Sequence, residues 1–284
     1  MTAQGSGVAA GFDCGVPGVD VLRLPEPDAP FLPDDCAEHQ LPEWRFTLPS
    51  ADPNAMARHR WWIGHQTTFC VWRLLADCLT EMARQGVRLT EPVRGAALMF
   101  DVYSLLLLYS GSCEPSVYEV DIRPDMAAAD GAFSGRWARD YERVSVLLRA
   151  ASINASWQVI APLRRAVKAN RIVHMAVARR LARGGESLLR LNGRLDAAVT
   201  DRQRALYDSY FHVRREPTCR RAFAMQILRL CMVVLDDMGE APLNEDAWFD
   251  TRAVERETIA RILADGPANL WNLITSSHVG RLLT

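Results

Sequence analysis

The residues best suited to chemistry in this sequence are two histidines on the apolar faces of predicted helices. Imidazole titrates near neutral pH and can therefore move protons, and its neutral form is a common metal ligand. The first histidine, His65, lies within one helical turn of Trp61, Trp62 and Phe69. An ionisable ring among aromatic side chains predicts a pocket at this point.

The second histidine, His174, belongs to a predicted helix that begins near Pro162. Steps of four and three residues along this helix form a stripe that consists of Leu163, Val167, Asn170, His174, Val177 and Leu181. This spacing predicts that His174 faces the core. A buried polar group without a partner costs on the order of 1–3 kcal/mol. The imidazole is therefore expected either to bond to a helix carbonyl or to coordinate a metal such as haem iron. Spacing alone favours a structural role for both histidines.

The elements that position these histidines are predicted to be helices throughout the chain. Periodic apolar residues predict helices over residues 55–85, 92–109, 116–122, 137–148, 162–181, 197–212, 217–238, 251–264 and 268–283. Arg123-Pro124 and Gly266-Pro267 are expected to end helices, because proline lacks the amide hydrogen that a helix needs. No alternating run typical of a strand and no internal repeat is found. The predicted fold class is an all-α helical bundle.

The N-terminal 50 residues differ in composition from the rest of the chain. Residues 1–50 are rich in Pro, Gly and Asp and predict an arm, whereas residues 51–284 predict a single helical domain. The apolar residues of 21–24 and 31–32 favour docking of part of the arm. Disorder and contact with a neighbouring subunit are the alternatives.

Composition excludes several classes of partner. The chain of 284 residues has 49% hydrophobic residues and a formal net charge of −1, which gives no electrostatic reason to expect nucleic acid or an anionic membrane. We find no secretory signal and no apolar segment judged long enough to cross a bilayer. The seven cysteines form no CxxC pair, which favours reduced thiols without disulfides. A cytoplasmic protein is expected.

Three stretches resemble tryptophan 2,3-dioxygenase. The run His59–Gln66, followed by Trp72, resembles the distal haem-pocket helix of that family. The run His174–Leu181 resembles its proximal helix, in which the histidine is followed by Val three residues later. Ser112 precedes Arg123 by the same spacing that separates the Ser-rich loop of the dioxygenases from the arginine that holds the substrate carboxylate. The resemblance covers roughly residues 55–190.

One departure indicates a different branch of this superfamily. The dioxygenases carry a Gly- and Thr-rich loop after the proximal helix, whereas this chain has Gly184-Gly185-Glu186-Ser187. The whole pattern is closer to the haem-dependent L-tyrosine hydroxylases of antibiotic biosynthesis, which belong to the histidine-ligated haem aromatic oxygenases. Some members attach haem through a cysteine at the position of Ala178, so the resemblance implies a non-covalent haem b.

The resemblance also implies a role for each candidate residue. His174 would be the axial ligand of the haem iron, and His65 would be the catalytic histidine over the opposite face, moving a proton because it titrates near neutrality. Arg123 would bind the substrate carboxylate, with Trp62 and Phe69 lining the pocket. The implied reaction is hydroxylation of L-tyrosine ortho to the phenol, which gives 3,4-dihydroxyphenylalanine with hydrogen peroxide as oxidant.

Two alternatives to this reaction come from different classes. The first is an oxygenase that acts on the indole of tryptophan with dioxygen. The second is a helical binding protein without a cofactor, in which both histidines are structural. The arm and the habits of the superfamily also favour a homo-oligomer.

Overall fold

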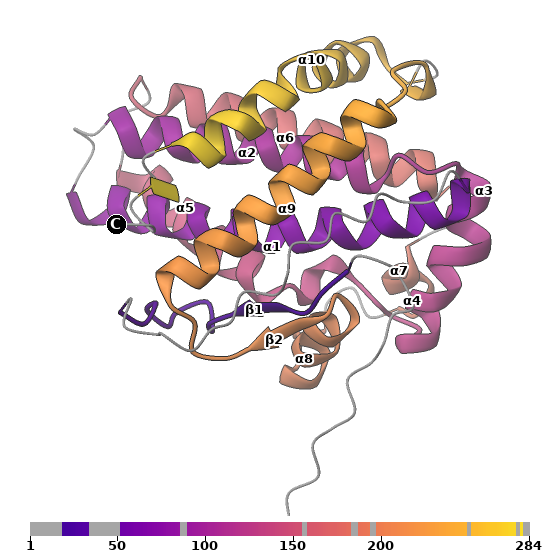
Figure 1. Ribbon diagram of the computed structural model, residues 1–284, viewed down its shortest axis with the longest axis horizontal. Coiled ribbons are helices and arrows are strands. Elements are labelled where there is room, and N and C mark those ends of the chain that lie inside the picture. The colour runs from indigo at the N-terminus through magenta and orange to yellow at the C-terminus, as the bar shows by residue number, and fades with distance from the viewer. Residues whose placement is uncertain are drawn as a thin grey trace, which may run out of the picture.

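The computed structural model describes residues 19–33, 52–85, 90–154, 158–182, 187–193, 197–248, 251–276 and 279–280, without the side chains of 152–154. Within these residues the chain is helical apart from two short strands, which confirms the predicted all-α class (Figure 1). The main helices are α1 (Pro53–Gln85), α2 (Thr90–Ser110), α5 (Arg139–Asn154), α6 (Ala161–Leu181), α8 (Asp201–Tyr210), α9 (Arg220–Glu240) and α10 (Ala253–Thr275). Shorter ones are α3 (Pro115–Val117), the π-helix η1 (Tyr118–Ile122), α4 (Arg123–Ala129), η2 (Gly135–Trp137), α7 (Leu188–Leu191) and η3 (Asp246–Trp248).

Helix α2 lies at the centre of the core. Gly64 brings α1 into close contact with Ser110 at one end of α2, and a methyl group at Gly64 would collide with that side chain. On another side, Asn170 of α6 donates a hydrogen bond of 3.2 Å to Ser104. On a third side α10 approaches closely, because Gly266 leaves room for Leu105. These contacts enclose α2 on three sides.

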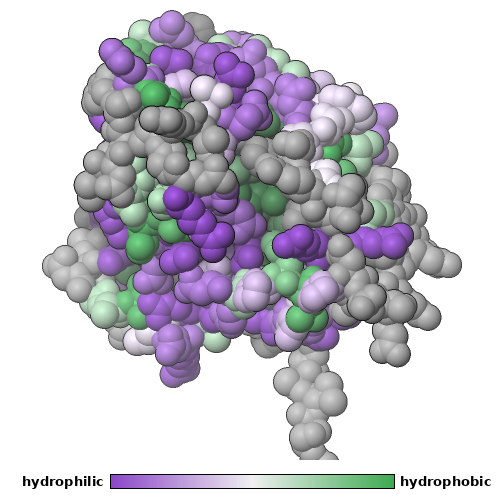
Figure 2. Space-filling view, turned by 90° about the vertical axis from the view of Figure 1, so that its left-hand side faces the viewer, coloured by the Kyte–Doolittle hydropathy of each residue, from purple (hydrophilic) through white to green (hydrophobic). Residues whose placement is uncertain are grey.

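One prediction from the sequence, that no apolar segment is long enough to cross a membrane, is corrected at α2. By length and composition α2 is apolar enough to cross a membrane, contrary to our expectation, but 72% of its apolar window is buried inside the protein. The coloured residues of the face in Figure 2 are mostly hydrophilic, and apolar residues form small separate areas. Helix α2 is therefore apolar because helices surround it, as expected for a core helix.

Two predicted helix ends are wrong. The helical run continues through Arg123-Pro124, because the amide of Arg123 donates to the carbonyl of Tyr118 five residues back, which closes a π-turn. Pro124 then falls in the first turn of α4, where a missing amide hydrogen costs little. Likewise, Pro267 lies inside the single helix α10, which the sequence had divided into two.

Part of the N-terminal segment lies against the helical body. Strand β1 (Leu22–Leu24) pairs in parallel with β2 (Val213–Arg215), two strands that the sequence did not predict. Phe31 packs on Phe223 with ring centroids 4.9 Å apart, and the guanidinium of Arg73 lies 4.4 Å from the Phe31 ring. The remainder of the predicted arm, residues 1–18 and 34–50, lies outside the described residues.

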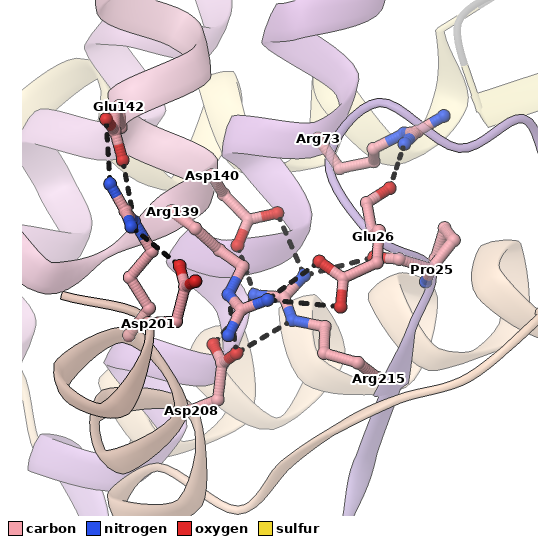
Figure 3. A network of polar contacts seen from close by, with 10 residues as sticks. Pro25, Glu26, Arg73, Arg139, Asp140, Glu142, Asp201, Asp208 and Arg215 are labelled. Atoms are coloured by element: carbon pink, nitrogen blue, oxygen red, sulfur yellow. Dashed lines mark hydrogen bonds and ion pairs between the residues drawn. The ribbon is translucent and has the colours of Figure 1, made fainter.

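A buried network of ion pairs joins this segment to the helices (Figure 3). Arg215 of β2 donates to Asp208 of α8 at 2.8 and 3.0 Å and to Asp140 of α5 at 3.2 Å. Arg139 pairs with Asp208 at 3.0 Å and with Glu26 of the N-terminal segment at 2.8 Å. The network therefore connects three regions that are far apart in the sequence: the N-terminal segment, α5, and α8 with the adjacent β2.

The cysteines differ from the prediction at one position. Cys219, at the start of α9, is disulfide-bonded, whereas Cys70, Cys78, Cys113 and Cys231 are buried free thiols. The expectation that the chain has no disulfide is wrong. The argument for a reducing compartment from cysteine placement is correspondingly weaker.

Candidate functional site

His65 is held in one orientation by its own helix and by two aromatic rings. Its Nδ1 lies 2.6 Å from the carbonyl oxygen of Trp61. The imidazole packs between the Trp61 ring, with centroids 4.4 Å apart, and the Phe211 ring, 4.2 Å away and tilted by 8°. Because a carbonyl only accepts hydrogen bonds, Nδ1 carries the hydrogen and Nε2 presents its lone pair. Within the described part of the chain no hydrogen bond reaches Nε2.

The surroundings of His65 keep its ring neutral. Burial lowers the pKa of His65 to about 4, because an imidazolium ion loses its hydration there, and the hydrogen bond to Trp61 offsets only part of this effect. The side chain nevertheless retains partial solvent access. The prediction that His65 titrates near neutrality is wrong. At physiological pH it is a base and hydrogen-bond acceptor.

His174 lies at a break in the packing of α6. Four residues of its stripe are buried, since Leu163, Asn170, Val177 and Leu181 have exposed fractions of 2%, 5%, 8% and 4%, and Val167 is partly exposed. The side chain of His174 is exposed, so the prediction that it faces the core is wrong. Surrounding protein still lowers the pKa of its imidazole through desolvation. His174 is therefore accessible to a ligand, and its imidazole is predominantly neutral at neutral pH.

Leu107, the residue of α2 level with this position, is also partly exposed. Asn170 bonds to Ser104, and Val177 lies against Gly111, so His174 is level with Leu107. Leu107 is partly exposed, although its neighbours Leu105, Leu106 and Leu108 have exposed fractions of at most 1%. The helices therefore leave this point of α2 and α6 uncovered within the described structure.

The helix stripes that carry the two histidines both lead towards α5. Trp72, two turns after His65 on the same stripe, packs on Tyr103 of α2 and Tyr141 of α5, with centroids 5.3 Å apart in each pair. Val167, two turns before His174, lines a groove together with Leu148 and Ala151 of α5. Because Gly64 touches the end of α2 at Tyr109 and Ser110, the two histidines also lie at similar heights along α2.

The groove beside α6 combines apolar and basic groups. Its volume is about 740 Å³, and its lining includes Met82, Leu148, Ile160, Leu163 and Val167. Arg164, Arg165, Lys168 and Arg171 also line it. Arg171 lies about one turn before His174 on the neighbouring stripe. The groove therefore runs along α6 and reaches a residue about one turn before His174.

Arg123 lies where the π-helix meets α4. Its Nη1 is 2.7 Å from a carboxylate oxygen of Glu119. Arg58 of α1 fixes this segment, because it donates to both oxygens of Asp121 at 2.7 Å and to Asp125 at 3.0 Å. A π-turn is uncommon and frequently marks a functional site.

The two aromatic residues predicted to line the pocket are buried side chains of α1. Phe69 has an exposed fraction of 0% and Trp62 of 4%, and the indole of Trp62 donates to the carbonyl of Tyr210 at 3.1 Å. The rings beside His65 are instead Trp61 and Phe211. Sequence reasoning missed Phe211, which precedes His212, a residue with φ of 54° in the turn between α8 and β2. A tight turn leaves little signal in a single sequence.

Taken together, these residues can bind an aromatic amino acid beside a redox cofactor. Aromatic rings and a neutral imidazole acceptor suit a phenol, and an arginine suits a carboxylate. No group of three or more metal-ligating side chains is found in the described ranges. A haem iron needs only an axial side chain, because the porphyrin supplies its other nitrogen ligands.

Comparison with protein families now decides the chemistry. Residues 16–169, more than half of the chain, match the family described as SfmD 3-methyl-L-tyrosine peroxygenase. The chain belongs to this family. The SfmD peroxygenase membership confirms the resemblance inferred from the sequence: this is a haem-dependent peroxygenase of the tryptophan 2,3-dioxygenase type that acts on tyrosine-like substrates. A comparison with curated proteins finds no match.

The extent of the SfmD match separates the candidate residues. His65 and Arg123 lie inside the matched residues, whereas His174 follows their end at residue 169. The Gly184-Gly185-Glu186 part of the divergent loop lies outside the described residues. Membership in an enzyme family excludes the cofactor-free binding protein considered above.

Proposed function

We propose that this protein hydroxylates L-tyrosine ortho to the phenol with hydrogen peroxide, giving 3,4-dihydroxyphenylalanine for the biosynthesis of an antibiotic. The observation that carries the proposal is the neutral His65, whose Nδ1 is held by the Trp61 carbonyl so that Nε2 is left as an acceptor. Family membership supports the haem, the peroxide and a tyrosine-like substrate. The choice of L-tyrosine rather than its 3-methyl derivative belongs to the proposal.

In this proposal His174 would bind the iron of haem b. The fit rests on an imidazole that is accessible on a mostly buried stripe and for which no hydrogen bond or ion pair is found among the described residues. Lys168 and Arg171, exposed on the same helix, are available for the two propionates. Ala178 offers no sulfur for a thioether bond, which supports non-covalent binding. When bound, the haem uses peroxide to supply the oxidising power for aromatic hydroxylation.

His65 handles protons at Nε2. As a neutral base it can take a proton from peroxide and return it to the departing oxygen. It can also accept a hydrogen bond from the substrate phenol, whose unperturbed pKa is about 10, which raises electron density at the ortho carbon. Packing between Trp61 and Phe211 keeps the ring from turning away.

Arg123 binds the carboxylate of the amino acid. Arg58, which fixes the Arg123 segment through Asp121, lies seven residues before His65 on the same face of α1. This separation corresponds to about 10 Å along the helix. A tyrosine can therefore reach from the segment of Arg123 towards His65.

The decisive experiment is product analysis with purified haem-loaded protein. L-Tyrosine and 3-methyl-L-tyrosine are each supplied with hydrogen peroxide, and the products are identified by mass spectrometry. We expect a catechol from both and a higher kcat/KM with L-tyrosine. A preference for the methylated substrate would overturn the choice of L-tyrosine, and absence of any catechol would overturn the hydroxylation itself.

The indole alternative is tested in the same assay. Tryptophan with dioxygen and a reductant would give N-formylkynurenine or an oxindole if the protein were an indole oxygenase. We expect neither product. Formation of either one at a rate comparable to tyrosine turnover would favour the alternative.

Three broader expectations remain part of the proposal. They are a homo-oligomer, a cytoplasmic location, and a single catalytic domain over residues 51–284 after an arm of residues 1–50. Light scattering of the purified protein tests the homo-oligomer. Fractionation of the producing cells tests the cytoplasmic location, and limited proteolysis near residue 50 tests the boundary between the arm and the domain.

A further inference from the structure

A pair of opposite charges at the π-turn matches the charges of a free amino acid. We propose that Glu119 binds the ammonium group of the substrate while Arg123 binds its carboxylate, so that the pair recognises the zwitterion of a tyrosine-like amino acid. This inference rests on the proposed function and adds a specificity-determining residue to it.

The geometry of the pair suits exchange with a ligand. In the described structure the guanidinium of Arg123 and the carboxylate of Glu119 are 2.7 Å apart, with side chains 15% and 36% exposed. A partly exposed ion pair one helical turn apart contributes little to stability. An amino acid can therefore insert its carboxylate and ammonium groups at small cost, because each charge of the pair exchanges one opposite charge for another.

The pair lies near the aromatic side chains that pack around His65. Arg123 and Glu119 both act on the hydroxyl of Tyr118: burial raises the pKa of Tyr118 to about 12, the positive charge of Arg123 lowers it, and the negative charge of Glu119 raises it. The ring of Tyr118 lies 5.9 Å from Trp61, which packs on His65. Two aromatic contacts thus connect the charged pair to the imidazole.

The other charges of this segment are already engaged with each other. Arg58 is bonded to both oxygens of Asp121 and to Asp125. The hydrogen bond from Arg58 lowers the pKa of Asp121, so this carboxylate stays ionised and bound. Of the carboxylates in this segment, Glu119 is therefore the one best suited to receive an ammonium group.

The test separates the two charges with three ligands. Calorimetry measures the binding of L-tyrosine, of 3-(4-hydroxyphenyl)propionate, which lacks the ammonium group, and of tyramine, which lacks the carboxylate, to the haem-loaded protein. For Glu119→Gln we expect tyrosine affinity to fall on the order of tenfold or more, with affinity for the propionate unchanged or higher. For Arg123→Gln we expect weaker binding of tyrosine and of the propionate, and unchanged binding of tyramine.

A matched control excludes a general effect of removing a carboxylate. Asp265 forms a comparable pair with Arg261 one turn away on α10, at 3.8 Å, and Asp265→Asn should leave all three affinities unchanged. The inference is overturned if Glu119→Gln leaves tyrosine binding intact, or weakens tyrosine and the propionate equally, since an equal loss means that Glu119 acts only through Arg123. If the unaltered protein binds no tyrosine at all, the proposed function fails as well. That result can be told apart from failure of this inference alone, in which the unaltered protein binds tyrosine but Glu119→Gln does not weaken tyrosine binding selectively.

Discussion

Two polar regions of this protein treat their ionisable groups in opposite ways. Around Arg215, buried charges are paired: its guanidinium meets Asp140 and Asp208, whose side chains are 3% and 5% exposed. At His65 and His174, by contrast, imidazoles are kept neutral by desolvation. No hydrogen bond to Nε2 of His65 or to either ring nitrogen of His174 is found among the described residues.

The difference separates groups that hold the fold from groups available for chemistry. A buried ion pair cannot lose one member without leaving an uncompensated charge. A neutral imidazole can remain without a partner at a much smaller cost. The comparison therefore predicts that the first region determines stability and the second determines haem binding and turnover.

The largest effect is expected from His174→Ala. Because this side chain would be the axial ligand and is exposed, the variant should lose its haem completely while its free energy of unfolding changes by no more than about 0.5 kcal/mol. Soret absorbance per mole of protein and chemical denaturation of the haem-free proteins measure the two effects. Met175→Ala, which removes a neighbouring side chain that is 52% exposed, should keep full haem. Full haem in His174→Ala would refute the assignment.

A large loss of stability is expected from Arg215→Ala. The variant leaves the buried Asp140 without its Arg215 partner, and Asp208 with Arg139 as its remaining cation, which should lower the free energy of unfolding by about 3–5 kcal/mol. Arg204→Ala serves as the control, because it removes ion pairs with the more exposed Glu142 and Asp201 and should cost less than about 1 kcal/mol. Urea denaturation measures both values. Equal losses would show that burial does not distinguish the two networks.

His65→Ala should separate haem binding from turnover. The haem ligand remains in this variant, so the Soret band should persist. Loss of the Nε2 base should reduce catechol formation by roughly a hundredfold to ten-thousandfold. Turnover of L-tyrosine with peroxide at saturating substrate measures the change. Unaltered turnover would remove His65 from the mechanism and leave it a structural histidine.

The smallest effect is expected from changing pH within the ordinary range. The pKa of His65 is lowered to about 4, so Nε2 stays unprotonated, and kcat should show no fall attributable to His65 near its ordinary value of 6.5. Acidification should reduce kcat only as the pH approaches about 4. Intrinsic fluorescence checks that the protein is still folded. A fall centred near pH 6.5 that disappears in His65→Ala would contradict a desolvated, neutral imidazole.

Much of the architecture followed from local patterns. The apolar stripe of α1 predicted a buried face, and Phe69, Leu75 and Leu79 have exposed fractions of 0%. The helix predicted over residues 92–109 is α2, and α6 begins near Pro162 as predicted. These features follow from the 3.6-residue period of a helix, which a single sequence displays directly.

The errors share one physical origin. Pro124 and Pro267 were read as helix ends, but a π-turn and close packing allow the helical runs to continue. Strands β1 and β2 are three residues long and exist because two distant segments meet. Each of these features depends on long-range contacts or on an unusual local hydrogen bond, neither of which has a periodic signature.

By itself, the sequence determined an all-α chain, and its resemblance to the haem-dependent tyrosine oxygenases singled out His65, Arg123 and His174 as candidate site residues. The tertiary structure decided the state of these groups. The Trp61 carbonyl sets the tautomer of His65, Phe211 packs against its ring, and burial lowers its pKa. The tertiary structure also leaves His174 accessible, although the apolar stripe predicted that it would be buried. The reason is that a side chain's type and helical phase are local properties, whereas its solvation depends on which distant elements come to cover it.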